Sequence, residues 1–145
     1  MGTLTNLTHE EAWEIGTGIR KSLMRKGVEA SIAVVNRDGR PLFQLAMDLA
    51  RPFTANVALL KAMQSAKTGW STKFVGESIA KGERTPQILN LDSATLIKFA
   101  GGLPIYDKSG NLLGGAGVSN LLAEEDEFHT RNGIKAAGFV PERSQ

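Results

Sequence analysis

The stretch from Ala100 to Asn120 places the strongest constraint on how this chain can fold. Its sequence, AGGLPIYDKSGNLLGGAGVSN, holds six of the sixteen glycines of the chain, interleaved with apolar residues. Glycine inside an apolar strand weakens that strand unless the backbone takes a positive φ or lies close to another group. We therefore expect a β-hairpin turning at residues 107–111. The face of this hairpin that carries glycines has few side chains. It either lets another element pack closely against the backbone or forms the wall of a ligand pocket, and we favour close packing.

The length, charge and composition of the chain limit the kinds of protein it can be. With 145 residues it can bury a real core, and we expect residues 1–145 to form a single domain. Seventeen basic and fifteen acidic residues leave a net charge of only +2. No long Lys/Arg cluster is present to meet phosphates, so no nucleic-acid partner is expected. The absence of cysteine excludes disulfides, thiolate metal sites and cysteine nucleophiles.

Neither a membrane span nor a secretory signal is expected from the sequence. No apolar run approaches the ~20 residues that cross a bilayer. The N-terminal sequence MGTLTNLTHEE lacks both a basic head and an apolar stretch. A cytoplasmic location is therefore the default expectation.

The N-terminal third of the chain predicts a helix followed by a hairpin. Residues 8–26 predict the helix, because Thr8 and Glu11 match a capping box and apolar residues recur on one face. Residues 30–35 and 41–47 predict two strands joined by a turn with an Asp-Gly pair. Both strands are apolar at nearly every position, so we expect an antiparallel sheet with helices covering both faces.

The middle of the chain predicts two helices and an irregular connection. Residues 53–68 form the first helix, with a stripe of alanines that lets it approach a sheet closely. Lys61 lies off that stripe, where a solvated side chain is the expected state. We expect a short helix at 72–81, an irregular connection of the kind often used as a lid or binding loop at 82–92, and a short strand at 93–99.

The last helix is expected at residues 122–137, with acidic residues early and basic residues late, as the helix dipole favours. Asp126 lies near the face directed at the sheet, four residues before Thr130. Its carboxylate is expected to accept hydrogen bonds from backbone N–H groups of the glycine-rich stretch, or to act on a ligand. We favour the structural role.

Several motifs of catalysis and metal binding are incomplete. His9 begins a sequence like H-E-x-x-H that lacks its second histidine, and a solvated side chain is expected there. Glu125 and His129, four residues apart, offer only two metal ligands, so no metal site is expected. The chain also lacks a nucleotide-binding glycine motif and a G-x-S-x-G nucleophile elbow.

A spaced set of residues nevertheless runs through nearly the whole chain. It comprises Asn36-Arg37-Asp38-Gly39, Asp48, Lys61-Ala62, Gly101-Gly102-x-Pro104-Ile105, Gly114, Gly117-Val118-Ser119 and Asp126-Glu127. With this set the chain resembles the GlcG/HbpS-type family of haem-binding-protein-like domains, which are also similar to the C-terminal domain of PduO-type corrinoid adenosyltransferases. The chain departs from the family pattern at Asn120, where the family has glycine, and at His129 and Asn132, where it has small residues.

The resemblance implies an α/β (α+β) fold that is profilin-like, an antiparallel sheet of about five strands with helices on both faces. It also implies a homo-oligomer and haem or another tetrapyrrole as the ligand of some members. Other members belong to operons for glycolate, glycerol or diol use. These implications make a small-ligand binding domain the first functional hypothesis.

On this hypothesis one pocket gathers residues from distant parts of the chain. Its expected ligand-binding residues are Asp48, Arg51, Lys61, Gly101, Gly102, Pro104, Asn120 and Asp126. His129 and His9 are the candidate haem ligands, because imidazole suits iron. Arg51 or Lys61 would meet the propionates.

Whether the chain is an enzyme is left open by the sequence. A catalytic alternative is an enzyme or accessory subunit acting on a small organic acid or aldehyde. Lys61 would serve there as a base or Schiff-base lysine, Asp126 as acid or base, and Arg51 as the anchor of a substrate carboxylate. A purely structural subunit, with the glycine-rich hairpin packed across an interface, is the third hypothesis.

Overall fold

The computed structural model describes residues 5–143. Its elements follow in the order α1 (His9–Lys26), β1 (Ser31–Asn36), β2 (Pro41–Ala46), α2 (Thr54–Thr68), α3 (Thr72–Ala80), β3 (Gly102–Tyr106), β4 (Leu112–Ser119) and α4 (Ala123–Ala136). All four helices lie where the sequence predicts them, to within a few residues. None of the helices in this part of the chain is both long and apolar enough to cross a membrane.

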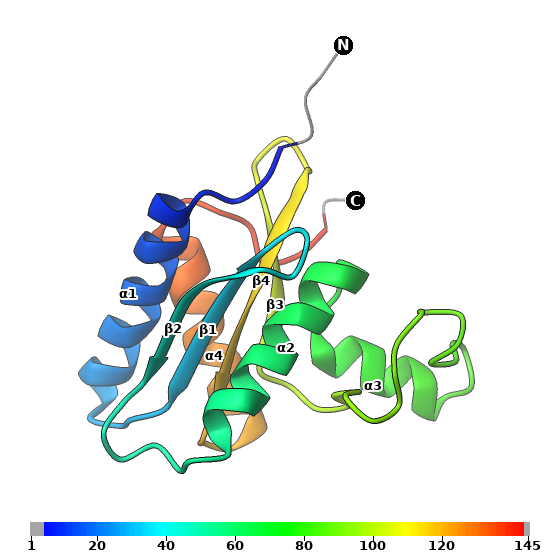
Figure 1. Ribbon diagram of the computed structural model, residues 1–145, viewed down its shortest axis with the longest axis horizontal. Coiled ribbons are helices and arrows are strands. Elements are labelled where there is room, and N and C mark those ends of the chain that lie inside the picture. The colour runs from blue at the N-terminus through cyan, green and yellow to red at the C-terminus, as the bar shows by residue number, and fades with distance from the viewer. Residues whose placement is uncertain (1–4, 144–145) are drawn as a thin grey trace.

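The four strands form one antiparallel sheet in the order β2-β1-β4-β3. Helices α1 and α4 pack together against one face, and α2 covers the other (Figure 1). The main core lies between α1, α4 and the sheet, and a smaller core of alanines and valine lies under α2. The predicted antiparallel sheet with helices on both faces is therefore confirmed.

Helix α1 begins and ends as its sequence predicts. Thr8 accepts a hydrogen bond from the backbone N–H of Glu11, and the Glu11 carboxylate accepts one from the N–H of Thr8, which completes the capping box. Gly27 ends the helix with a left-handed φ of 68°. The buried face of α1 includes Ile15 and Ile19, which belong to the main core.

Helix α2 lies directly on the glycine-rich face of β4. A Cβ atom added at Gly115 would overlap the backbone of Ala62 and Ala66, and one at Gly117 would overlap the carbonyl of Ala58. These glycines therefore allow a helix to approach the sheet at backbone distance. The packing use is confirmed, and the alternative of a bare pocket wall is wrong on this face because α2 fills the space.

Two sequence expectations about strands need correction. Among residues 5–143 the sheet has four strands, not about five, because residues 93–99 form a turn and irregular backbone instead of a strand. Within them, the backbone of Ile97 pairs with the side-chain amide of Gln64, so no strand partner is required. In addition, β1 is buried along its length but β2 is an edge strand with exposed positions, so helices do not cover both faces of β2.

Candidate functional site

Lys61 is a buried lysine, although its place in the sequence predicts a solvated side chain. Its side chain leaves the middle of α2, is only 1% exposed, and is among the largest fully buried side chains of the described chain. The Nζ atom donates hydrogen bonds to the carbonyl of Val118 at 2.8 Å and to the Asp126 carboxylate at 3.1 Å. The expectation of a solvated lysine is wrong, because Asp126 and a backbone carbonyl replace the water that the ammonium loses.

The glycine-rich stretch makes the room that Lys61 needs. Gly101 has a φ of 133°, and a Cβ atom at this position would overlap the Lys61 ammonium. At Gly117 an added Cβ would lie 2.8 Å from the Lys61 Cβ, and at Gly102 it would overlap the Lys61 carbonyl. The Lys61 ammonium therefore requires glycine at position 101, and the close approach of α2 around Lys61 requires glycine at 102 and 117.

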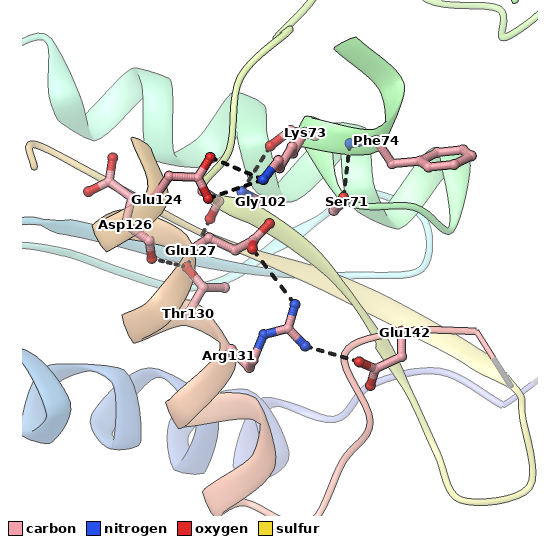
Figure 2. Close-up of polar contacts among 12 residues, drawn as sticks. Ser71, Lys73, Phe74, Gly102, Glu124, Asp126, Glu127, Thr130, Arg131 and Glu142 are labelled. Carbon is pink, nitrogen blue, oxygen red and sulfur yellow. Dashed lines mark hydrogen bonds and ion pairs between the residues drawn. The ribbon is translucent and has the colours of Figure 1, made fainter. Parts of the chain in front are cut away.

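Asp126 approaches the same point from the opposite face of the sheet. It lies in the first turn of α4, is 2% exposed, and accepts a hydrogen bond from the backbone N–H of Leu121 at 3.0 Å. The favoured structural role is supported, but this backbone donor belongs to the segment that leads into α4. Thr130, one turn later, donates to the carbonyl of Gly101 at 2.8 Å and to that of Asp126 (Figure 2). The ion pair thus ties α2, on one face, to α4, on the other.

Burial opposes both charges of this pair. Removal from water lowers the pKa of Lys61, and the attraction of Asp126 acts in the opposite direction. Burial also raises the pKa of Asp126, against the Lys61 charge and the N–H groups of Leu121 and Asn120. A lysine and a carboxylate whose pKa values are shifted toward each other can exchange a proton more readily than the same pair in water.

An aromatic ring covers the lysine on its remaining side. The Phe99 ring centroid lies 5.1 Å from Lys61 Nζ, within the range of a cation–π contact. Phe99 itself is 49% exposed and belongs to the irregular segment between α3 and β3. A half-exposed side chain is therefore one of the groups that contact the ammonium.

Asn120 links the next part of the predicted site. Its φ of 143° is unusual for a residue with a side chain, and this is the position where the resemblance implies glycine. Its amide donates to the carbonyl of Glu29 at 2.8 Å and accepts from the backbone N–H of Arg51 at 3.2 Å. The first bond joins the loop before α4 to the segment between α1 and β1, and the second joins it to the loop before α2.

The structure brings only part of the predicted ligand site together. Lys61, Gly101, Gly102 and Asp126 form one buried cluster, which Asn120 joins to the backbone of Arg51. Asp48, in contrast, lines a surface hollow with Arg20 and Met24, and Pro104 lines another with Trp70 and Arg131. The assignment of all eight residues to ligand binding stays a prediction, but they do not share one hollow among those described.

His129 lies apart from the Lys61–Asp126 cluster and lines a separate surface hollow. It projects from α4, is 3% exposed, and its Nδ1 lies 2.7 Å from the hydroxyl of Ser22 on α1. Asn132 also donates to that hydroxyl, at 2.9 Å. The ring lines a hollow of about 510 Å³ together with Lys26, Val28, Glu124, Glu125 and Phe128. Burial lowers the pKa of His129, which favours the neutral imidazole.

His9, the other candidate haem ligand, is exposed in the first turn of α1, as expected. It lines a shallow hollow with Glu10, Trp13, Glu14 and Leu42. No hydrogen bond within residues 5–143 orients its ring. The same described residues contain no group of three or more His, Asp or Glu side chains that could hold a metal ion.

Surface ion pairs fix α4 against its neighbours beside the buried cluster. Figure 2 shows Lys73 of α3 reaching Glu124, and Arg131 lying between Glu127 and Glu142. The Lys73 Nζ atom lies 3.3 Å from a carboxylate oxygen of Glu124. The carboxylate of Glu124 raises the pKa of Lys73. The pairs with Lys73 and Glu142 are largely solvent-exposed, so each contributes little stability.

Three important residues escaped the sequence analysis. Ser22 orients His129 across 107 positions of sequence, Phe99 covers Lys61, and Gln64 anchors residue 97. Ser22 lies at a buried position of α1, between apolar neighbours. This serine on the apolar face of an amphipathic helix is the one sequence signal that could have indicated a buried polar contact, because a buried hydroxyl needs a hydrogen-bond partner.

The architecture defines a mixed α/β class: an antiparallel sheet between two helix layers, closed at one end by a buried lysine–aspartate pair. Within that class the chain belongs to the HbpS-like family, since the family model described as "Haem degrading protein HbpS-like" matches residues 7–135. The resemblance seen in the sequence is thereby confirmed. No curated protein sequence matches the chain at a significant level.

Solved structures agree with this fold. A double mutant of Streptomyces reticuli HbpS has a TM-score of 0.81 and 26% identity, covering 94% of this chain and 90% of that one. Klebsiella pneumoniae protein ORFY has a TM-score of 0.84 and 21% identity, with 94% of each chain covered. A PduOC–haem complex has a TM-score of 0.85 and 17% identity, with 96% of this chain and 100% of that one covered. The last two likenesses concern the fold alone.

Proposed function

We propose that this protein is a small-ligand binding domain and that haem is its ligand. The family description and the haem in one structural neighbour support the ligand class. The observation that carries the proposal is the His129 hollow, which combines an oriented imidazole with an aromatic ring, an aliphatic side chain and a lysine. An apolar wall with a few polar groups is the usual form of a cofactor site.

The residues around His129 fit what a haem requires. Ser22 holds Nδ1 in place, which leaves Nε2 as the nitrogen for iron; a second partner on the other nitrogen is the usual arrangement for a ligating histidine. Phe128, half exposed, lies 5.2 Å from the His129 ring, and its edge-on ring together with Val28 supplies apolar contact for a porphyrin. Lys26 supplies a cation for a propionate. Bound haem would supply iron whose reactivity the axial ligand tunes.

The hollow at His9 fits haem less well. Glu10 and Glu14 bring two negative charges beside the imidazole, and no cation lines that hollow. The His129 hollow also contains two carboxylates, but Glu124 is already paired with Lys73. We therefore assign the iron to His129 and not to His9.

A hemin titration followed by the Soret band tests this assignment. We expect the wild-type protein to shift the band, and the His129→Gln variant to weaken binding by roughly tenfold or more or to lose the shift. The matched His9→Gln variant, which removes an exposed imidazole, should behave as wild type. A wild-type protein that leaves the Soret band unchanged would overturn the proposal, as would equal binding by wild type and His129→Gln.

The buried Lys61 favours a second candidate function, an enzyme or accessory subunit acting on an aldehyde or small organic acid. In that case Asp126, whose carboxylate lies 3.1 Å from Nζ, takes the ammonium proton, and the neutral amine adds to the carbonyl carbon. Loss of water then gives the imine. The Phe99 ring would have to move aside for a substrate to enter.

Borohydride trapping with glyoxylate and glycolaldehyde tests this second candidate. We expect a reduced adduct on the peptide that contains Lys61, more of it in Phe99→Ala, and none in Lys61→Arg. An adduct spread over exposed lysines with none at Lys61, in both wild type and Phe99→Ala, would reject it. A role in glycolate, glycerol or diol metabolism depends on this outcome.

Self-association is part of the same proposal. Leu49, Phe53 and Leu122 are exposed in the loops that Asn120 holds together, so they gather at one end of the sheet. An apolar patch of this kind suits contact with a second copy. Sedimentation velocity should show an oligomer that Leu122→Asp weakens, and a wild-type monomer at high concentration would contradict the expectation.

A further inference from the structure

A separate hollow lies at the other end of the sheet from the Lys61–Asp126 pair. It is formed by the turn between β1 and β2, the outer side of α2 and the irregular segment before β3. Leu60, Met63 and Leu91 give it an apolar lining. Its volume of about 440 Å³ lies in the range of small-molecule sites, roughly 300–1,000 Å³.

The charged side chains at the rim of this hollow are not equivalent. Asp38 accepts a hydrogen bond from Asn6 at 3.1 Å, and Asp92 accepts one from the backbone N–H of Ala94 at 2.9 Å. Arg37 and Lys67 make no side-chain hydrogen bond or ion pair with any residue between 5 and 143. Within the described part of the chain, the hollow therefore presents two cations without partners, while each of its acids already accepts a hydrogen bond.

Hydrogen bonds hold two walls of the hollow in place. Gln64, 5% exposed, accepts from the backbone N–H of Ile97 at 2.8 Å and donates to its carbonyl at 2.7 Å, which fixes the irregular segment to α2. On the opposite wall, Asn6 accepts from the backbone N–H of Arg37 at 2.8 Å. The shape is thus set before any ligand binds, which lowers the entropy cost of binding.

We propose that this hollow binds a small amphipathic organic anion, with an apolar body and a single acidic head. The apolar body lies on Leu60, Met63 and Leu91, and the acidic head is placed between Arg37 and Lys67. Long cationic side chains over an apolar floor meet both halves of such a molecule. The site is independent of the His129 hollow, since the two lie on opposite faces of the sheet and share no residue.

The probe for this site is 1-anilinonaphthalene-8-sulfonate, a permanently charged aromatic anion whose fluorescence rises in apolar surroundings. N-phenyl-1-naphthylamine has the same aromatic body without the sulfonate and serves as the uncharged probe. We expect the sulfonate to bind wild type, and the Arg37→Gln/Lys67→Gln variant to bind it roughly tenfold more weakly. Binding of the uncharged probe should not change in that variant.

Two further variants make the test specific. Arg20→Gln/Lys21→Gln removes one arginine and one lysine from exposed positions of α1, on the other face of the sheet, and should leave the affinity for the sulfonate unchanged. Met63→Gln keeps the side-chain length but makes the floor polar, and should weaken both probes. Equal affinity of wild type and Arg37→Gln/Lys67→Gln for the sulfonate would overturn the proposal. So would an equal loss of affinity in the α1 variant, because the effect would then reflect net charge.

Discussion

At the scale of single residues, Lys61 is a fully buried charge whose counter-charge, Asp126, is buried as well. An ion pair out of water is no strong source of stability, because desolvation offsets the attraction of the two charges. Removing one partner is a different matter, since the other charge is left buried without compensation. The pair is therefore best tested by single and double substitutions in the same chain.

We predict that Asp126→Asn lowers the free energy of unfolding by about 3–5 kcal/mol, because Lys61 keeps its burial and loses its counter-charge. Lys61→Met, which removes the ammonium but keeps an unbranched side chain, should also destabilise the fold. The double variant Lys61→Met/Asp126→Asn should lose much less than the sum of the two single changes. Additive losses in urea unfolding would show that the two residues act separately.

Protonation of His129 gives a second prediction at this scale. Its pKa is lowered below the ordinary 6.5 by burial, with Lys26 and Arg25 acting in the same direction and Glu125 opposing. The unfolded chain then binds the proton more readily, so stability is full above about pH 6.5 and falls as pH decreases through the window below it.

Urea unfolding at pH 7.5 and pH 5.5 measures this effect. We expect wild type to lose up to about 1 kcal/mol more between these two values than His129→Gln, which has no titrating group at that position. The same pH dependence in both proteins would contradict the buried neutral imidazole.

At the scale of elements, the close approach of α2 to β4 controls the glycine-rich face. We predict that Gly115→Ala destabilises by about 1–3 kcal/mol, because the new methyl group overlaps the α2 backbone at Ala62. Gly18→Ala is the matched control, since its methyl group meets Gly133 at an ordinary 3.4 Å and helix propensity favours alanine. The two variants should shift the thermal midpoint in opposite directions, and a Gly115→Ala protein as stable as wild type would contradict this packing.

The elements that could be predicted from sequence are those with local signals. The capping box at Thr8, the Asp-Gly turn and the helix-stopping glycines act within a few residues, and all are found in the structure. No strand forms at 93–99, and the backbone N–H and carbonyl of Ile97 within it pair with Gln64, more than thirty residues away. The sequence predicts a solvated Lys61 for the same reason, since the burial of a lysine depends on a partner that only the fold supplies.

At the scale of the whole molecule, the two ends of the sheet differ in chemistry. One end is closed by the Lys61–Asp126 pair and surrounded by exposed apolar side chains. The other carries the hollow with Arg37 and Lys67. The His129 hollow lies beside α1 and α4, on the face of the sheet opposite α2. From the sequence, His129 was the only residue of this hollow that could be predicted as a ligand-binding candidate. Family membership could be predicted from residues spaced along the sequence. Which side chains lie together in each hollow could be seen only in the three-dimensional structure.

The central claim is that iron is held by His129 in the hollow between α1 and α4. A crystal structure of the protein with hemin, with anomalous data collected at the iron edge, tests it most directly. We predict a single anomalous peak in coordination contact with Nε2 of His129, with the porphyrin against Phe128 and Val28. A peak beside His9, or an iron bound to neither histidine, would contradict the account.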